Sequence, residues 1–316
     1  MTLDAISTFE QNVNAVLLGK REIVRRALIV LICRGHMLLE DVPGTGKTVF
    51  AKAIARSLEA EYKRIQFTPD LLPSDVTGSS IFNQKTNAFE FMAGPLFTHV
   101  LLADEINRAT PRTQAALLEA MEERQVTVDG TTYRLPDSFF VIATQNPIEQ
   151  QGTFPLPEAQ LDRFLMKMSI GYPPVESELS VIDIRADSHP VDSVRPVMNL
   201  ESLQSLRTHV ENVFVHSSIK MYILSIVRMT RAHSDLVLGV SPRGALALRR
   251  CAQGLALVEG RDYVTPDDVK RLTVDVLSHR IMIKPQVRVG GKSEQQIILE
   301  ILNSVQVTVE YAPQAP

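Results

Sequence analysis

The stretch EDVPGTGKTVF, residues 40–50, decides the expected fold of this chain. It is close to the phosphate-binding pattern G-x-x-x-x-G-K-[ST], in which backbone N–H groups and a lysine face a phosphate. Asp41 stands where the pattern has its first glycine. Because that position needs a sharp turn more than close ligand approach, and aspartate tolerates unusual backbone angles, we expect a working nucleotide-binding loop rather than a plain turn. The residues expected to hold the phosphates are Val42, Pro43, Gly44, Thr45, Gly46, Lys47 and Thr48.

Short apolar runs separated by amphipathic segments predict an α/β fold with a parallel sheet covered by helices. The five runs are 37–39, 65–67, 100–103, 139–143 and 164–170. After the loop, Phe50, Ala53, Ile54 and Leu58 recur at helical spacing. The loop is therefore expected to join a strand to a helix, as a phosphate-binding loop must.

The chain has 316 residues and is 45% hydrophobic, which favours two domains. The tandem prolines Pro173 and Pro174 remove backbone donors and favour extended backbone, so we expect a boundary there. Residues 1–173 form the expected α/β nucleotide-binding domain, and 174–316 show mainly helical periodicity. In VTPDDVKRL, Thr265 is the expected cap of one helix of this smaller domain.

Composition gives no sign of a nucleic-acid or membrane partner. Lys and Arg total 33 against 36 Asp and Glu, for a net charge of −3. The longest early apolar run is too short to cross a bilayer, and no export leader is recognisable, so we expect a soluble cytoplasmic protein. The histidines lack metal-ligand spacing, and Cys33 and Cys251 are interpreted as buried thiols.

Polar residues follow two of the expected strands. In HVLLADEINRA, Asp104 directly follows an apolar run and would hold Mg²⁺ beside the Thr48 hydroxyl, while Glu105 would polarise an attacking water. The alternative is a solvated acidic pair that caps the following helix. In FFVIATQNP, Asn146 could bind the same water or the γ-phosphate, or it could simply start an Asn-Pro turn.

The order of these segments resembles the AAA+ ATPases, and several of them are closer still to the MoxR family. The segments that carry the resemblance are EDVPGTGKT, LLADEINRATPRTQAALLEAMEERQVTVDG, VIATQNPIEQQGTFPLPEAQLDRF and GVSPRGAL. Together they span most of the chain, and Asp41 resembles that family's usual departure from the glycine. The resemblance implies a five-stranded parallel sheet with a small all-helical C-terminal lid.

The resemblance also implies roles for individual residues. Lys47 and Thr48 match the Walker A pair, Asp104 and Glu105 match the Walker B pair, and Asn146 matches the sensor 1 residue. These positions imply ATP and Mg²⁺ as the ligands of the site.

Two arginines match positions that stabilise charge during phosphoryl transfer. Arg163 in LDRF matches the arginine finger, which reaches the nucleotide of a neighbouring subunit, and Arg243 in SPRG matches sensor 2 of the lid, which faces the bound nucleotide. Leu18 and Gly19 resemble the segment that packs near the adenine. Without the family, a surface ion pair for Arg163 and a helix-start salt bridge for Arg243 are the favoured interpretations. Ser241 is interpreted as the cap of the helix that carries Arg243, not as a nucleophile.

Two insertions are expected to form β-hairpins, near residues 78–94 and 125–135. The second has alternating Val126 and Val128 before Asp129 and Gly130, a pair typical of a tight turn. In the resembling proteins such hairpins point toward the pore or upper face of a ring. Structural decoration is the equally weighted alternative.

The resemblance implies an ATPase that assembles as a homo-oligomeric, hexameric ring and remodels or matures protein clients, including metal-cofactor insertion. A separate protein with a von Willebrand factor A domain is the implied partner. Two rivals stay open: a nucleic-acid-stimulated motor of related build, and a scaffold that binds nucleotide with negligible turnover.

Overall fold

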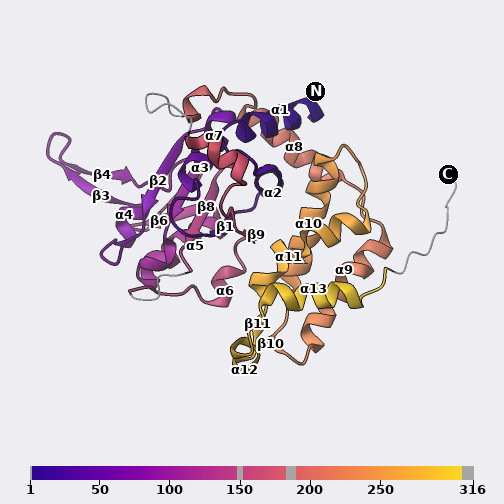
Figure 1. The fold of residues 1–316 in the computed structure, drawn as a ribbon. Helices are drawn as coiled ribbons and strands as arrows, with labels where there is room; N and C mark the ends of the chain where they lie inside the picture. The colour runs from indigo at the N-terminus through magenta and orange to yellow at the C-terminus, as the bar shows by residue number, and fades with distance from the viewer. Residues whose placement is uncertain (1, 148–151, 183–189, 308–316) are drawn as a thin grey trace.

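The computed structural model describes residues 2–147, 152–182 and 190–307. Its centre is a five-stranded sheet in the order β2-β5-β8-β1-β9, with every neighbouring pair parallel (Figure 1). The strands are β1 (Met37–Glu40), β2 (Tyr62–Gln66), β5 (Val100–Asp104), β8 (Phe140–Gln145) and β9 (Met166–Met168). Each apolar run of the sequence overlaps one strand, so the expected parallel sheet is confirmed.

The helices around the sheet bury apolar stripes against it. They are α1 (Thr2–Asn14), α2 (Arg21–Ile32), α3 (Lys47–Ser57) and α5 (Pro111–Glu123). In α2 every residue from position 27 to position 32 is buried, because the helix lies between the sheet and the C-terminal helices. That continuous burial explains why ALIVLI is apolar all round.

The C-terminal region is a bundle of five longer helices, and two of the expected caps are confirmed. The helices are α8 (Leu200–Asn212), α9 (Ser217–Ala232), α10 (Pro242–Val258), α11 (Pro266–Leu277) and α13 (Glu294–Ser304). Ser241 accepts a hydrogen bond from the Gly244 N–H at the start of α10, and Thr265 forms a capping box with Asp268 at the start of α11. The helical lid expected from the sequence is therefore present.

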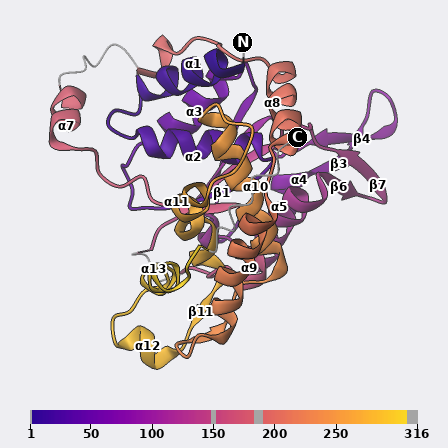
Figure 2. The same cartoon turned by 90° about the vertical axis from the view of Figure 1, so that its right-hand side faces the viewer.

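The lid also contains a short pair of strands that local sequence patterns did not predict. The strands β10 (Leu236–Leu238) and β11 (Met282–Ile283) form a short antiparallel pair, followed by α12 (Pro285–Val289). Figure 2 shows β11 and α12 at the end of the lid farthest from α1. The remaining short elements are α4 (Pro73–Thr77), α6 (Glu158–Leu161), α7 (Val175–Ile182), η1 (Ile106–Arg108), η2 (Pro190–Ser193) and η3 (Ser278–Arg280).

Both insertions form antiparallel hairpins, as the sequence predicts. The first pairs β3 (Gly78–Asn83) with β4 (Ala88–Ala93), and the second pairs β6 (Gln125–Val128) with β7 (Thr131–Arg134). Asp129 and Gly130 have φ of 49° and 77°, the left-handed backbone that a two-residue hairpin turn requires. Phe91 and Tyr133 stack with ring centroids 4.0 Å apart, so the hairpins contact each other. They project on the side of the sheet away from the lid (Figure 1).

One hydrophobic cluster runs from α1, α2 and α3 into the lid helices. Helices α2 and α10 pack closely in this cluster, because a Cβ on Gly254 would lie 2.7 Å from the Sγ atom of Cys33, the residue that ends α2. Cys33 and Cys251 are both buried and free, as interpreted from the sequence, and burial raises the pKa of Cys33 to about 12. A second cluster fills the other face of the sheet, beneath α5.

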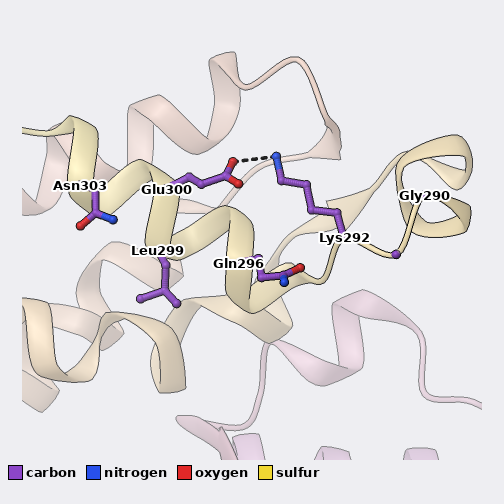
Figure 3. Close-up of a pocket in the computed structure, with 7 residues that line it drawn as sticks. Gly290, Lys292, Gln296, Leu299, Glu300 and Asn303 are labelled. Carbon is purple, nitrogen blue, oxygen red and sulfur yellow. Dashed lines mark ion pairs between the residues drawn. The ribbon is translucent and has the colours of Figure 1, made fainter.

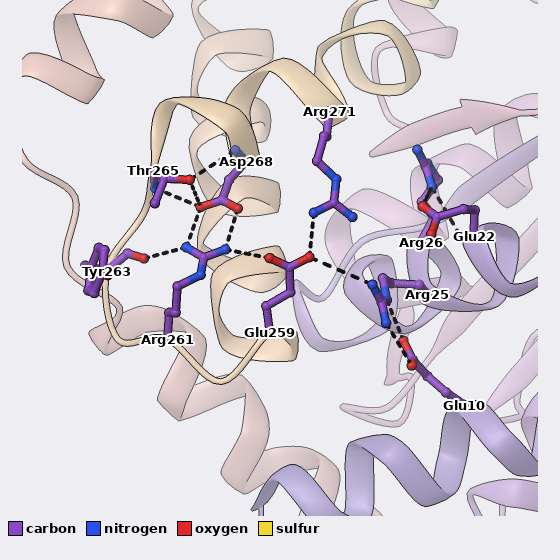
Figure 4. A network of polar contacts seen from close by, with 10 residues as sticks. All are labelled: Glu10, Glu22, Arg25, Arg26, Glu259, Arg261, Tyr263, Thr265, Asp268 and Arg271. Carbon is purple, nitrogen blue, oxygen red and sulfur yellow. Dashed lines mark hydrogen bonds and ion pairs between the residues drawn. The ribbon is translucent and has the colours of Figure 1, made fainter. Parts of the chain in front are cut away.

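A network of ion pairs covers the edge of this contact between the sheet domain and the lid (Figure 4). Arg25 of α2 binds Glu10 of α1 at 2.9 Å and lies 3.8 Å from Glu259, the residue that ends α10. Glu259 also pairs with Arg271 of α11. The network therefore links α1, α2, α10 and α11.

In the part of the chain that the structure describes, no helix combines the length and apolar character needed to span a bilayer.

Candidate nucleotide site

The phosphate-binding loop lies at the carboxyl end of β1, and two of its glycines have left-handed backbone. Gly44 and Gly46 have φ of 87° and 88°, and Gly46 directly precedes α3. No heavy atom would lie within 4 Å of a Cβ on Gly44, so backbone conformation and not crowding selects glycine there. The Lys47 ammonium donates to the carbonyls of Asp41 and Val42, at 3.1 Å each. The loop thus presents the start of a helix and a lysine beside an open concave backbone.

Asp41 has a structural role that explains the departure from glycine. Its carboxylate, with only 4% of the residue exposed, accepts hydrogen bonds from the backbone N–H groups of Ile170 (2.6 Å) and Gly171 (2.9 Å) and from the Ser169 hydroxyl (2.7 Å). These three residues follow β9 and lead to Pro173 and Pro174. Asp41 therefore fastens the base of the phosphate loop to the segment that enters the lid.

Asp104 ends β5 and is 8% exposed. Its Oδ1 atom accepts from the Thr144 hydroxyl at 2.6 Å, and its Oδ2 atom accepts from Arg64 Nη2 at 2.7 Å. Strands β5 and β1 flank β8, so their carboxyl ends are separated by about 10 Å, two strand spacings. Asp104 and the phosphate loop consequently open on the same edge of the sheet.

Glu105, the residue that follows β5, has a left-handed backbone with φ of 57°. Its side chain makes no capping hydrogen bond to η1, unlike the helix-cap alternative. Instead its Oε2 atom accepts from Gln66 Nε2 at 2.7 Å and from Arg108 Nη1 at 3.0 Å. Glu105 is therefore held by Gln66 of β2 and Arg108 of η1. Gln66 lies two residues from Arg64 on the same edge strand.

Asn146 follows β8 on the same sheet edge and is 6% exposed. It lines a cavity of ≈ 950 Å³ together with Glu40, Gln145 and Lys167. The opposite wall comes from the lid and includes Ser278 and Met282. Asn146 thus lies between the phosphate loop and Asp104, in the row where the sequence placed it.

Arg163 and Arg243 lie together at the opposite edge of the sheet, the one formed by the amino ends of the parallel strands. Both pair with Glu122 of α5: Arg163 Nε is 3.0 Å from Oε2, and Arg243 Nη1 is 2.7 Å from Oε1. They line a cavity with Gly35 and His36, which precede β1, whereas the phosphate loop follows β1. A strand of four residues, about 13 Å, therefore separates Arg243 from the loop of its own chain. Its expected contact with a nucleotide stays a prediction, and in this structure it makes an ion pair.

The segments that carry the two arginines are tied to each other. Asp162 accepts from Arg280 Nε at 2.7 Å and from the Ser241 hydroxyl at 3.2 Å. Arg280 is buried and also donates to the Phe164 carbonyl at 2.7 Å. The finger segment and the start of α10 consequently form one hydrogen-bonded unit.

The segment expected near the adenine lies against the phosphate loop. A Cβ on Gly46 would lie 3.5 Å from a Leu17 methyl carbon. Gly19 has φ of 74°, and a Cβ there would lie 2.7 Å from Pro174 Cδ. Leu18 lies between these two contacts, so residues 17–19 bridge the loop and the entrance to the lid. Leu17 itself was not identified from the sequence.

A separate hollow of ≈ 450 Å³ lies on the lid, along α13 (Figure 3). Its one cation, Lys292, is paired with Glu300 at 2.6 Å and Asp235 at 2.8 Å. These two carboxylates neutralise the lysine, so the hollow lacks the excess positive charge that a triphosphate requires. The loop edge of the sheet remains the candidate nucleotide site.

Sequence reasoning missed Arg64, Gln66 and Glu122. The first two lie on β2, the edge strand of the sheet, for which the sequence indicated only the apolar run 65–67. The available signal was the alternation of Arg64, Ile65 and Gln66, which places the two polar side chains on one face. Glu122 lies in a charged helix end, and no local pattern separates it from Glu123.

Comparisons with known proteins agree with this geometry. Residues 36–166 match the model of the "ATPase family associated with various cellular activities (AAA)", and residues 228–301 match the AAA lid domain. An uncharacterised protein of Bacillus subtilis, YeaC, is 52% identical over 95% of this chain and 94% of its own. Chaperone MoxR1 of Mycobacterium tuberculosis is 40% identical, over 93% of this chain and 80% of its own.

A crystal structure of a protein from Cytophaga hutchinsonii has a TM-score of 0.90 and 39% identity, covering 98% of this chain and 96% of that one. More distantly, magnesium-chelatase subunit ChlI-1 of Arabidopsis thaliana is 29% identical over 59% of this chain and 44% of its own. The two family models and the 40% identity to chaperone MoxR1 over 93% of this chain show that the chain belongs to the MoxR family of AAA+ ATPases, enzymes that hydrolyse ATP.

Proposed function

We propose that this ATPase forms a homo-oligomeric ring, hexameric in its working state, and uses ATP hydrolysis in the cytoplasm to remodel or mature protein clients. The relatives named as chaperone and as a magnesium-chelatase subunit support this, and they extend the proposal to insertion of metal cofactors. A separate protein with a von Willebrand factor A domain would deliver or present the client. The observation that carries the proposal is the division of the site between two opposite sheet edges.

The residues at the loop edge suit a nucleotide with a divalent cation. Lys47 and the backbone of residues 42–48 would bind the phosphates, and Thr48 and Asp104 would hold Mg²⁺. Asp104 already binds a cationic group, the Arg64 guanidinium at 2.7 Å, so its carboxylate is suited to a cation. When bound, Mg²⁺ neutralises charge on the phosphate oxygens. Glu105 would accept a proton from water, and Asn146 would orient that water.

The two arginines suit a site that a neighbouring subunit completes. Arg163 and Arg243 are at the edge opposite their own loop, so a triphosphate that they contact would belong to another copy. Guanidinium groups at the transferring phosphate are worth about 10³ to 10⁵ in rate when they act as fingers. Hydrolysis would then require assembly, and turnover per subunit should rise with protein concentration.

Glu105→Gln tests the enzyme half of the proposal. The amide keeps the shape of the side chain but cannot take a proton, so turnover should fall about 100-fold or more while nucleotide binding is retained. Glu123→Gln, on the exposed end of α5, is the matched control and should hydrolyse ATP normally. An unchanged rate in Glu105→Gln would favour the scaffold with negligible turnover.

The same variant tests the client half. Glu105→Gln rings loaded with ATP should retain protein clients during affinity capture, and mass spectrometry would identify them. Retention of nucleic acid alone, with a rate stimulated by DNA and steeply reduced by salt, would replace the chaperone proposal with a nucleic-acid motor.

A further inference from the structure

We propose that Glu122 is a positioning residue that orients Arg163 and Arg243 together toward the triphosphate held by a second copy of this chain. The inference rests on the proposed function, because it assumes that neighbouring subunits share a site. It goes further by assigning a role to a carboxylate on α5 that belongs to neither arginine's segment.

The contacts of Glu122 leave the tips of the arginines available. Its two oxygens are used by different partners, Oε2 by Arg163 and Oε1 by Arg243. Arg163 is held through Nε, the guanidinium nitrogen nearest its stem, so its two terminal nitrogens have no hydrogen-bond partner among the described residues. Arg243 is held through Nη1 alone. A guanidinium fixed at one nitrogen keeps its other donors for a phosphate.

The surroundings make this carboxylate necessary. The cavity that contains the pair, ≈ 410 Å³ in volume, is lined by two acids and six arginines: Glu122, Asp162, Arg34, Arg124, Arg163, Arg243, Arg250 and Arg280. Asp162 is already bound to Arg280 and Ser241. Glu122 is therefore the lining carboxylate that balances Arg163 and Arg243, which would otherwise repel each other and the nearby cations.

The excess of positive charge also identifies the ligand class. The whole chain has a net charge of −3, yet this cavity has four more arginines than carboxylates, counting six against two. Among the residues that line it, burial and then the charge of Arg34 lower the pKa of Arg124. A polyphosphate would supply the missing negative charge, and the partly exposed side chains of Arg163 (28%) and Arg243 (46%) make the cavity reachable from a neighbouring copy.

The first test compares Glu122→Gln with its neighbour Glu123→Gln, since both changes remove one charge from the end of α5. The glutamine can accept from only one arginine and turns an NH₂ group toward the other. Turnover at saturating ATP should fall about 10-fold. The KM for ATP and the affinity of the isolated chain for nucleotide should stay at the wild-type values, because the loop edge is intact. Glu123→Gln should match the wild type.

The second test mixes subunits. Lys47→Ala chains lack a working phosphate loop but keep their arginines, whereas Glu122→Gln chains have a working loop and misplaced arginines. In mixed rings, the loop of one variant meets the arginines of the other, so the mixture should exceed the summed rates of the two variants alone. Glu122→Asp, shorter by one methylene of about 1.5 Å, is a second variant that should lose turnover and be rescued in the same way.

The outcomes distinguish a failure of the proposed function from a failure of the role of Glu122. A wild-type chain without ATP turnover would overturn the proposed function itself. With an active wild type, normal turnover in Glu122→Gln, an equal loss in Glu123→Gln, a raised KM with unchanged turnover, or a loss that mixing does not rescue would each overturn the role of Glu122.

Discussion

Arg64 Nη2 lies 2.7 Å from Asp104 Oδ2, so an arginine of the edge strand binds the carboxylate expected to hold Mg²⁺. The Arg64 side chain is 45% exposed and that of Asp104 is 11% exposed, which makes the pair accessible from solvent on one side. A metal ion and this guanidinium carry charges of the same sign. A Mg²⁺ ion held as proposed would therefore compete with Arg64 for the Asp104 carboxylate.

Replacing Arg64 with Gln should consequently strengthen the binding of Mg²⁺ at Asp104. We expect the Mg²⁺ concentration that gives half-maximal ATP hydrolysis to fall about 3-fold or more, since a charge-assisted contact no longer has to be broken. Lys63→Gln is the control, because it removes a charge from the same strand while its partners are Glu61 and the Phe97 carbonyl. A Mg²⁺ titration that is identical for wild type and Arg64→Gln would contradict the competition.

Asp41 should matter more for stability than for phosphate contact. In Asp41→Gly the loop regains the general pattern, but three donors around the buried carboxylate lose their acceptor. Of the three, Ile170 is buried, whereas Ser169 is exposed and can bond to water. An unsatisfied buried donor costs about 1 to 3 kcal/mol, so we expect a loss of that size in the free energy of unfolding, read from urea titration. The folded fraction should still bind nucleotide.

Glu40→Gln provides the comparison for Asp41, because Glu40 is the adjacent acid and pairs with Lys167 at a partly exposed site. Its loss should be under about 1 kcal/mol. Equal stability in Asp41→Gly and wild type would show that the three hydrogen bonds contribute nothing net.

The free energy of unfolding should also depend on pH through His36. Burial, and then the charge of Arg124, lower its pKa to about 3. Its Nδ1 atom accepts from the Val141 N–H at 3.0 Å, and Nε2 lies 3.2 Å from the Met121 carbonyl, which fits a neutral ring. The unfolded chain takes up this proton near pH 6.5, so the contribution is complete above that value and is lost as pH falls toward 3.

The expected slope from this group is about 1.4 kcal/mol per pH unit below 6.5. His36→Gln keeps one donor and one acceptor without titrating, so its unfolding free energy should vary less steeply between pH 6.5 and 4.5. Chemical unfolding at several pH values measures both slopes. Parallel curves for the two proteins would exclude His36 as the source.

Close packing between α2 and α10 should make Gly254→Ala destabilising. The new Cβ would lie 2.7 Å from Cys33 Sγ and 3.1 Å from Ile29 Cγ2, so side chains must shift. We expect a loss of about 1 to 2 kcal/mol, since overpacking outweighs the better helix propensity of alanine. Adding Cys33→Ala removes the sulfur and should recover part of the loss. Strictly additive effects in urea unfolding would contradict this contact.

The sequence predicted what depends on local pattern. Apolar runs placed the strands, Asp129 and Gly130 placed a hairpin turn, and Thr265 placed a helix start, because period, turn chemistry and capping act over a few residues. The shared edge of the phosphate loop and Asp104 was also predictable, because parallel strands bring their carboxyl ends together.

What the sequence could not predict depends on packing between distant segments. The partners of Asp41 lie 128 to 130 positions along the chain, and Glu122 meets Arg243 across 121 positions. The position of Arg243 follows from where the lid packs on α2, and local residues around SPRG do not encode that contact. The resemblance implied a role for this arginine, but it did not predict at which edge of the sheet the arginine lies.

The hydrophobic cluster shared by α1, α2, α3 and the lid has a geometric consequence for a ring. It sets the separation between the phosphate loop and the two arginines of one chain, so in the proposed ring it would set the angle that each subunit occupies. A ring of identical subunits would close only if every subunit occupied the same angle. A change of that angle in one subunit would therefore open the interface with its neighbour.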